Sequence, residues 1–198
     1  MTGQGIRLLV GLGNPGEQYE ATRHNVGFWF VDRIATSYRE PFRAEPKFHG
    51  HLCRIRLLGS DLRMLKPSTY MNRSGQSIAA VARYFAIPPE QILIAHDELD
   101  LAVGQVRLKQ GGGHAGHNGL RDTIGALASR DFWRLRIGIA HPGDRTLVTG
   151  YVLSRPSRAD AEQIGRALVD AEGVLDELVG GRFQLAMNRL HSARRDQC

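Results

Sequence analysis

Short apolar runs alternate with segments of helical periodicity along this chain, and that alternation constrains the fold more than any other feature of the sequence. Runs at residues 6–11, 92–95 and 134–140 have the length and composition of buried strands. Apolar residues recur at intervals of three and four over residues 25–38 and 74–85, which predicts amphipathic helices, and a further helix is expected near 119–128. Strands that alternate with helices in this way predict an α/β fold with helices on both faces of a sheet.

Three further strands decide what kind of sheet this is. Residues 48–57 and 62–66 are strand-like and flank Gly59-Ser60-Asp61, which is typical of a hairpin turn. Residues 105–109 predict one more strand, followed by a glycine-rich loop at 111–119. Because a hairpin introduces an antiparallel pair, we expect a twisted, mixed sheet that is mostly parallel.

The C-terminal part of the chain is expected to be helical. Residues 182–192 predict one helix, and the segment before them predicts another, because its apolar residues keep steps of four and three: Ile164, Leu168, Ala171, Leu175 and Leu178. No repeat, low-complexity block or linker interrupts the 198 residues. We therefore expect residues 1–198 to form a single domain.

Several protein classes do not fit this sequence. Its apolar runs are far shorter than the roughly 18–20 residues that a membrane-spanning helix needs, and the N-terminal segment lacks the pattern of a secretory signal. The two cysteines, Cys53 and Cys198, can form neither a disulfide framework nor a thiolate metal site. We therefore expect a protein of the reducing cytoplasm.

The charge balance is basic. Lysine and arginine number 26 against 20 acidic residues, giving a net charge of +6. Such an excess suits a polyanionic partner such as nucleic acid, although it is also common in proteins that bind none. The basic residues are spread along the chain, except for the terminal pair Arg194 and Arg195.

Two glycine motifs match known loops by letter but not by context. Residues 11–16, GLGNPG, match the G-x-G-x-x-G pattern of dinucleotide-binding folds, yet Asp32, at the distance where an acid should end a second strand, lies in a predicted helix. Residues 111–113 resemble the oxyanion loop of lipases, but the chain has no G-x-S-x-G, and Ser77 in the nearest match lies in a predicted helix. Neither motif supports an oxidoreductase or a serine esterase.

Two histidine pairs have spacings that also occur in metal sites. His49 and His51 would point to one face of a strand, and His114 and His117 flank a glycine turn. Such pairs are frequent in proteins without metal, and neither has a third ligand at a fixed spacing. We therefore expect no metal.

Four asparagines lie beside glycine, proline or histidine, or at a helix start: Asn14, Asn25, Asn72 and Asn118. Each alone is typical of a turn or a helix cap. An amide side chain donates and accepts hydrogen bonds without carrying charge, so together they suit gripping a peptide backbone or holding a water near a carbonyl group.

A histidine and an aspartate are placed where they can meet. His24 precedes the first predicted helix, and Asp97 follows the buried strand at 92–95, between His96 and Glu98. If the strand ends share one edge of the sheet, Asp97 can orient His24 as a base. The alternative, in which His24 bonds only to nearby backbone at a helix start, stays open on these grounds.

Two long segments of the chain resemble the signature segments of the bacterial peptidyl-tRNA hydrolase family. They are residues 19–32, YEATRHNVGFWFVD, and 113–122, GHAGHNGLRD. GLGNPG, KPSTYMNRSG, HDELD and RLRIGIAHPG also resemble segments of that family and occur in the same order and spacing. The resemblance runs from about residue 6 to about residue 190.

This resemblance implies a metal-free esterase of the translation apparatus. We expect such an enzyme to be a monomer and, because its ester substrate is activated, to need no cofactor. Its reaction would split the ester between a peptide and the 3′ ribose of tRNA, recycling tRNA from prematurely released peptidyl-tRNA. The family's catalytic histidine falls on His24 and its partner aspartate on Asp97. The implied substrate-binding residues are Asn14, Tyr19, Met71, Asn72, His117 and Asn118, and the implied tRNA phosphate contacts are Arg107 and Lys109.

Two positions depart from the family pattern. Residue 115 is alanine where the family often has glycine, and residue 107 is arginine where lysine is usual. These changes put in doubt the shape of the loop at 111–119 and the phosphate contacts. A non-catalytic RNA-binding module would keep the basic surface but would need neither His24 nor Asp97, and the presence of both favours an enzyme.

Overall fold

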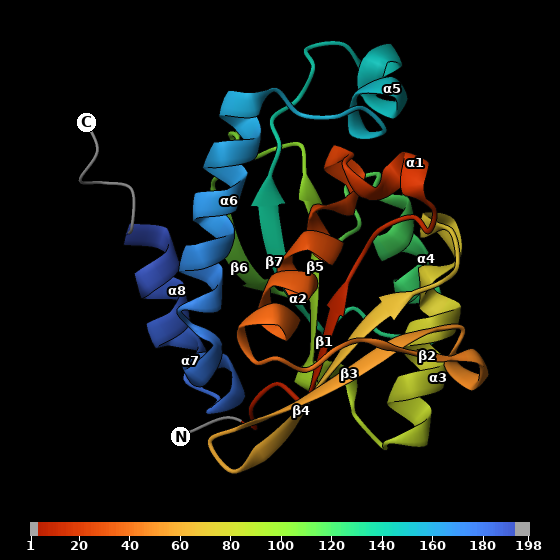
Figure 1. The fold of residues 1–198 in the computed structure, drawn as a ribbon, viewed down its shortest axis with the longest axis vertical. Helices are drawn as coiled ribbons and strands as arrows, with labels where there is room; N and C mark the ends of the chain where they lie inside the picture. The colour runs from red at the N-terminus through yellow and green to blue at the C-terminus, as the bar shows by residue number, and fades with distance from the viewer. Residues whose placement is uncertain (1–3, 193–198) are drawn as a thin grey trace.

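Seven strands form one mixed sheet in this computed structural model, which describes residues 4–192 (Figure 1). The basic pair Arg194 and Arg195 and the second cysteine, Cys198, lie outside the described residues. In chain order the strands are β1 (Leu8–Gly11), β2 (Arg43–Glu45), β3 (Gly50–Leu57), β4 (Ser60–Pro67), β5 (Ile92–Glu98), β6 (Val106–Gln110) and β7 (Trp133–Gly138).

The strand order is β2-β3-β4-β1-β5-β7-β6. Strands β4, β1, β5 and β7 run parallel, whereas β2, β3 and β6 pair in antiparallel fashion. This confirms the expected mixed, mostly parallel sheet. Strand β5 lies between two parallel neighbours, and all seven of its residues are buried. The polar residues 96–98 at its carboxyl end are therefore held firmly by the sheet.

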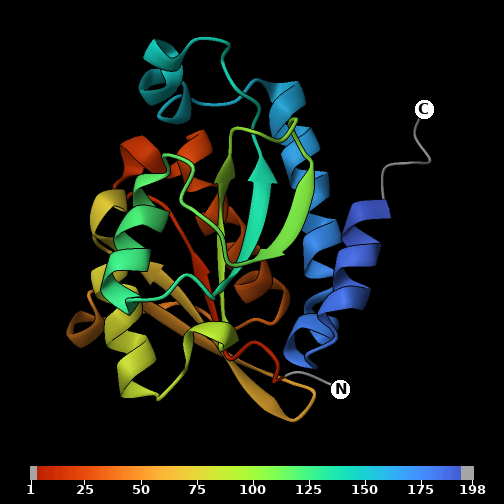
Figure 2. The same cartoon turned by 180° about the vertical axis from the view of Figure 1, so that it is seen from behind.

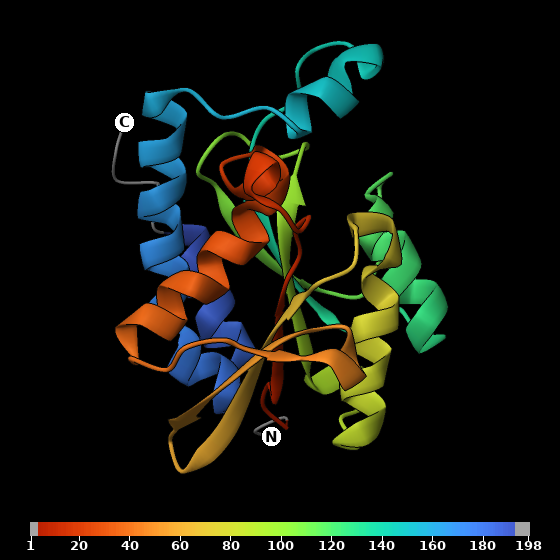
Figure 3. The same cartoon turned by 45° about the vertical axis from the view of Figure 1, so that its right-hand side comes forward.

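Helices cover both faces of the sheet, as expected. Figure 3 shows α2, α6, α7 and α8 on one side and α3 and α4 on the other, and Figure 2 shows β6 at the sheet's edge. No helix among residues 4–192 combines the length and the apolar character needed to cross a bilayer. The helices are α1 (Glu17–Glu20), α2 (Val26–Ser37), α3 (Ser74–Tyr84), α4 (Asn118–Leu127), α5 (Val148–Val152), α6 (Arg158–Glu172), α7 (Leu175–Val179) and α8 (Phe183–Ser192).

Each face of the sheet has its own apolar core. On one face Phe30 of α2 and Leu9 of β1 pack with residues of α6, α7 and α8. On the other face Ile78 of α3 and Leu120 of α4 pack with Leu8 of β1. A large apolar side chain contributes about 1.5–3 kcal/mol when it is fully buried. Packing on both faces therefore fixes the strands whose ends carry the polar residues.

Gly27 lets helix α2 approach the sheet closely. A Cβ atom at this position would lie 2.4 Å from the carbonyl oxygen of Ala95 and 2.5 Å from the amide nitrogen of Leu12. Such contacts are far inside van der Waals distance, so only glycine fits here without a shift of the backbone. The first turn of α2, and His24 just before it, are consequently held directly above the carboxyl ends of β1 and β5.

The single late helix expected from the spacing of apolar residues is wrong. The structure has two helices there, α6 ending at Glu172 and α7 beginning at Leu175. Val174 leaves helical geometry at φ −110° and ψ 11°, after Gly173, which has low helix propensity. The break turns the chain so that both Val174 and Leu175 are buried. The apolar face was predicted correctly, but not the bend within it.

Candidate active site

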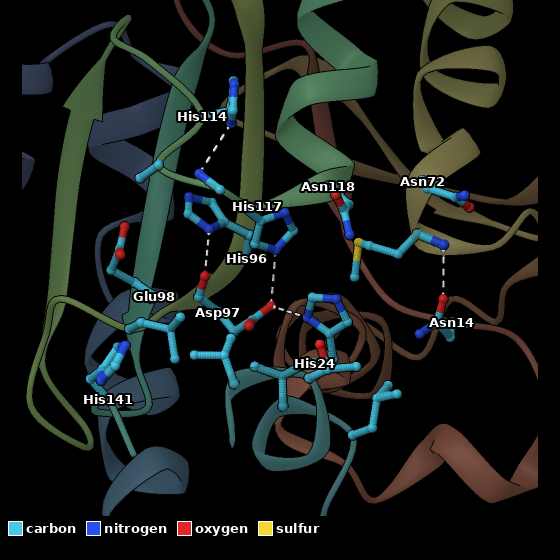
Figure 4. Close-up of a pocket in the computed structure, with 18 of the residues that line it drawn as sticks. Asn14, His24, Asn72, His96, Asp97, Glu98, His114, His117, Asn118 and His141 are labelled. Atoms are coloured by element: carbon cyan, nitrogen blue, oxygen red, sulfur yellow. Dashed lines mark hydrogen bonds and ion pairs between the residues drawn. The ribbon is translucent and has the colours of Figure 1, made fainter. Parts of the chain in front are cut away.

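A cavity of about 510 Å³ opens at the carboxyl ends of β1 and β5 (Figure 4). Its walls come from segments far apart in the chain, including residues 70–72, 96–100, 114–118 and 145–153. Seven of the residues singled out from the sequence line it: Asn14, His24, Met71, Asn72, Asp97, His117 and Asn118. Tyr19, Arg107 and Lys109 do not.

His24 and Asp97 meet inside this cavity. His24 Nδ1 lies 2.8 Å from Asp97 Oδ1, and the two side chains are 12% and 2% exposed. Since a carboxylate only accepts hydrogen bonds, Nδ1 carries the proton and donates it to Asp97. His24 Nε2 is then the nitrogen that is free to take a proton. The alternative in which His24 bonds only to local backbone is not what the structure shows.

Burial and charge act in opposite directions on this pair. Burial alone would lower the pKa of His24, but the negative charge of Asp97 and the hydrogen bond to it prevail and raise that pKa above its ordinary value. Burial would raise the pKa of Asp97, yet the charges and hydrogen bonds of His24 and His117 hold it far below its usual range. Asp97 is therefore a carboxylate at neutral pH.

His117 donates a second hydrogen bond to the same carboxylate oxygen. Its Nε2 lies 3.0 Å from Asp97 Oδ1, and its Nδ1 accepts from the amides of Gly119 and Leu120 at the start of α4. The helix cap requires an unprotonated Nδ1, which places the proton on Nε2. His117 thereby ties the first turn of α4, and Asn118 with it, to Asp97.

His96 supplies a neutral wall behind His117. Its Nδ1 donates to the backbone oxygen of Asp97 at 2.7 Å, and its ring meets that of His117 edge to face at 5.0 Å. Burial is the largest influence on His96 and lowers its pKa to about 3. His96 Nε2 is buried and has no hydrogen-bond partner among residues 4–192. The sequence placed His96 at the strand end but indicated no role for it.

Three of the asparagines line the cavity: the side chain of Asn14 is held by a hydrogen bond, whereas in the described part of the chain those of Asn72 and Asn118 are not. Asn14 Oδ1 accepts from the amide of Met71 at 2.8 Å (Figure 4). Asn25 Oδ1 accepts from the backbone amide of Asn14, and Asn25 Nδ2 donates to its backbone oxygen. Because its side-chain oxygen is occupied, Asn14 can offer a ligand only its Nδ2 donor. Asn72 and Asn118 are exposed within the cavity, and their amide groups make no hydrogen bond to other described residues. The structure gives Asn25 a supporting position rather than one in the cavity wall.

The remaining predicted residues lie outside the cavity. Tyr19 meets the ring of Tyr70, which lines the cavity, edge to face at 6.3 Å. Arg107 on β6 donates to the backbone oxygen of His191 at 3.2 Å. A Cβ atom at Gly112 would lie 3.2 Å from Lys109 Nζ, which places Lys109 beside the glycine-rich loop.

The ligating atoms of His24, Asp97 and His117 lie within 4.8 Å of one another, close enough for a metal ion to be considered. Their hydrogen bonds argue otherwise, because both imidazole nitrogens that face Asp97 carry protons, whereas a metal ligand must be deprotonated. Among residues 4–192, neither histidine pair seen in the sequence is joined as a pair by a third potential ligand. His49 is left-handed at φ 50° and precedes β3, so the expected one-face placement with His51 is wrong.

Sequence reasoning missed the wall formed by residues 145–153. Arg23, next to His24, is 8% exposed and donates to Ser154 Oγ at 2.8 Å and to the backbone oxygen of Arg155 at 2.9 Å. Its guanidinium also lies 4.1 Å from the ring centre of Tyr151. Arg23 thereby fastens the segment that contains α5 over the cavity. Nothing in the sequence indicates a contact across more than 120 residues.

Arg134 holds the loop at 111–117, which carries alanine at position 115. Ala115 adopts φ 45°, a left-handed conformation that costs roughly 1–2 kcal/mol for a residue with a side chain. Arg134 offsets this cost by donating to the backbone oxygens of Gly112, at 2.6 Å, and Gly113. The loop that leads to His117 is therefore fastened to β7 at these two backbone oxygens.

Comparisons with known proteins agree with this geometry. A family model described as peptidyl-tRNA hydrolase matches residues 8–197. The peptidyl-tRNA hydrolases of Methylobacillus flagellatus and Marinobacter nauticus are each 53% identical to this chain, covering 95% and 96% of it and 97% and 96% of their own length. The crystal structure of peptidyl-tRNA hydrolase from Acinetobacter baumannii has a TM-score of 0.93 and 48% identity, with 96% of both chains covered.

Proposed function

Because this chain belongs to the peptidyl-tRNA hydrolase family, we propose that it cleaves the ester between peptide and tRNA by general-base catalysis at His24, with water as the nucleophile. Family membership makes it an enzyme, a hydrolase of peptidyl-tRNA. The contact between His24 Nδ1 and Asp97 Oδ1 inside the cavity carries the proposed mechanism. An aminoacyl ester is already activated, so hydrolysis needs neither a protein nucleophile nor a redox cofactor.

In the first step a water attacks the ester carbonyl carbon while His24 Nε2 takes one of its protons. A well-placed general base contributes about 10²–10⁴-fold to such a step. Asp97 holds the ring in the tautomer that leaves Nε2 bare and stabilises the imidazolium as charge develops. When the tetrahedral intermediate collapses, the bond to the ribose oxygen breaks, and the imidazolium returns its proton to that oxygen.

The developing oxyanion needs a donor, and the open amides of Asn72 and Asn118 are the groups available for it. One well-placed donor stabilises such a transition state by about 3–4 kcal/mol. Asn118 is the better held of the two, because it begins α4, whose N-terminus His117 caps. We therefore assign stabilisation of the oxyanion to Asn118. Asn72 would instead hold the attacking water or contact an amide group of the substrate.

Substrate selection follows from the neutrality of the asparagines. Asn14 Nδ2 donates to a carbonyl oxygen of the peptide, a group that every peptide has whatever its side chains, and Met71 lines the same wall. Tyr19 supports this wall through Tyr70. A free α-amino group would bring a charge to a place built for a neutral amide, and leaving that charge unpaired costs about 1–3 kcal/mol.

The test of this function is to compare N-acetylated and free aminoacyl-tRNA as substrates of the purified protein. We expect release of tRNA from the acetylated form to be at least about tenfold faster, since about 1.4 kcal/mol gives a factor of ten. Equal rates for the two forms would indicate a generic esterase.

We propose that the reaction requires no metal. The protons that His24 and His117 direct at Asp97 Oδ1 support this. Incubation with a strong chelator is expected to leave turnover of N-acetylated aminoacyl-tRNA unchanged. A loss of activity that added Zn²⁺ or Mg²⁺ restores would show instead that these three residues hold a metal.

Activity is expected to rise with pH through the pKa of His24. A protonated Nε2 cannot accept a proton from water, so the reaction needs the neutral ring. Because Asp97 raises this pKa, the midpoint of the rise should lie above the ordinary histidine value of about 6.5. The measurement is kcat/KM between about pH 5 and about pH 9. A rate that does not change across this range would argue against an imidazole base.

Arg107 and Lys109 are proposed to contact phosphates of the tRNA. Both lie on β6 at the edge of the sheet, and Lys109 stands beside the loop that bears His117. We also propose that the protein acts in the cytoplasm as a monomer, with residues 1–198 as one domain. The unbroken seven-stranded sheet supports the single domain, and a substrate that arises from translation supports the location.

A further inference from the structure

Four arginines gather at the end of the sheet opposite the cavity, where the proposed reaction has no use for them. Arg7 precedes β1, Arg54 and Arg56 lie on β3, and Arg63 lies on β4. They line a second cavity of about 570 Å³. In Figure 1 the turn between β3 and β4 is at the lower end of the molecule, whereas the carboxyl ends of β1 and β5 point to the upper end.

The charges of this cluster are not balanced from within. Arg54 and Arg63 stand directly opposite each other in the antiparallel ladder, an arrangement that is unfavourable for like charges. Only two acidic residues, Glu40 and Asp61, share the cavity with the four arginines, which leaves two positive charges in excess. The ion pair between Arg54 and Asp61 is long, at 3.5 Å, and lies in solvent. A bound anion would relieve this repulsion.

The pKa of Arg63 is lowered, in agreement with the geometry. Burial has the largest effect on this pKa. The negative charge of Asp61 raises it, whereas the positive charges of Arg7 and Arg54 lower it further. Arg7 is also held in place, since its guanidinium donates to the backbone oxygen of Ala86 at 3.4 Å. The fold thus holds these arginines close together although their positive charges repel one another.

Aromatic rings extend the arginine cluster across the end of α3. The Arg63 guanidinium lies 4.1 Å from the ring centre of Phe85, which contacts the ring of Tyr84 edge to face at 4.9 Å. Lys47 lies over Tyr84 at 4.6 Å, and Tyr84 is 63% exposed. We call the whole set the hairpin surface; its members are Arg7, Lys47, Arg54, Arg56, Arg63, Tyr84 and Phe85.

We propose that the hairpin surface binds single-stranded RNA, with its arginines on the phosphates and Tyr84 against a base. Guanidinium groups match phosphates in a bidentate way, and exposed rings beside basic groups are the combination that holds unpaired nucleotides. An isolated phosphate would need no ring. The inference does not depend on the role of His24, and the contact is separate from the cavity in which the ester is cleaved.

The test measures binding of a fluorescently labelled oligouridine of about twelve nucleotides by polarisation, at several salt concentrations. For the double variant Arg54→Gln/Arg63→Gln we expect affinity to fall about tenfold. The slope of log K against log salt should become shallower by about 1.4 units, since each phosphate contact on a single strand contributes about 0.7.

The matched control is Arg158→Gln/Arg166→Gln, which removes the same charge from exposed positions on α6 and should change affinity by less than about twofold. Tyr84→Ala should weaken binding about fivefold, whereas Tyr84→Phe, which keeps the ring, should not. Cleavage of N-acetylated aminoacyl-tRNA by Arg54→Gln should match the unmodified protein.

Three results would overturn the proposal. They are an unchanged affinity in Arg54→Gln/Arg63→Gln, an equal loss in the α6 control, and an equal loss in Tyr84→Ala and Tyr84→Phe. Because Arg63 packs on Phe85, thermal unfolding of each variant is recorded, and the single variant Arg54→Gln, whose side chain is 68% exposed, repeats the test without risk to the fold. Its expected loss in salt slope is about 0.7 units.

Discussion

Replacement of His24 by alanine is expected to lower the rate of ester cleavage by about 10²–10⁴-fold, while binding of substrate stays within about threefold. The variant removes the nitrogen that accepts the proton of water but leaves the asparagines and Met71 in the cavity wall. The rate is measured in single turnovers at saturating enzyme with N-acetylated aminoacyl-tRNA, and binding is measured separately with uncharged tRNA. This separation shows whether the chemical step alone is affected.

The matched control for this variant is His141→Ala. His141 lines the same cavity, but its Nδ1 accepts a hydrogen bond from Gly143 in its own loop, and within residues 4–192 the side chain of Asp97 pairs with His24 and His117 instead. Its loss should change the rate by less than about fivefold. If His24→Ala keeps most of the activity, His24 is not the base. Added imidazole should restore part of the lost rate, since a free base in the vacated space can replace the side chain.

The sequence predicts where Asp97 lies, but the contact with His24 follows only from the resemblance to the family. Residues 92–95 form an apolar run typical of a buried strand, and the next residues are polar, so we expect them at the carboxyl end of the sheet. The approach of His24 depends on Gly27, which lets α2 sit against β1 and β5. The sequence indicates His24 and Asp97 as candidates, but it does not show how closely α2 approaches the sheet.

The hydrogen bonds that fix the neighbours of this pair could not be predicted. His117 reaches Asp97 only because its other nitrogen caps α4, and the sequence pattern places α4 without giving the direction of its first turn. Arg23 meets Ser154, which lies just after α5 in a segment where the sequence shows no apolar period. Contacts of this kind depend on loop geometry, which the residue types alone leave open.

The same limit applies to the fold. The longer strands form short apolar runs, and helices α2, α3, α4 and α8 show apolar residues at steps of three and four or lie near the expected ranges, so the sequence predicts them within a few residues. Strand β2 and helices α1 and α5 have three to five residues each, too few to show a period. The bend at Gly173 and Val174 keeps the apolar face turned to the core, so the spacing alone could not reveal it.

Replacement of Asp97 by asparagine should separate the charge of this residue from its shape. The amide introduced by Asp97→Asn can still accept hydrogen bonds from His24 and His117, but it no longer stabilises the imidazolium, and we expect the rate to fall by about 10²–10⁴-fold. The pH profile should move as well. With the carboxylate gone, burial prevails and lowers the pKa of His24, so the rise in activity should shift to lower pH than in the unmodified enzyme.

Asp100→Asn provides the control, because Asp100 lines the same cavity and the charge change is identical. Its rate should stay within about threefold and its pH midpoint should stay in place. A purely structural role for Asp97 would lower the rate of Asp97→Asn without moving the midpoint, or would move it upwards. Only a downward shift agrees with a carboxylate that raises the basicity of His24, because the negative charge is then lost and burial, which favours the neutral ring, is opposed only by a hydrogen bond to a neutral amide.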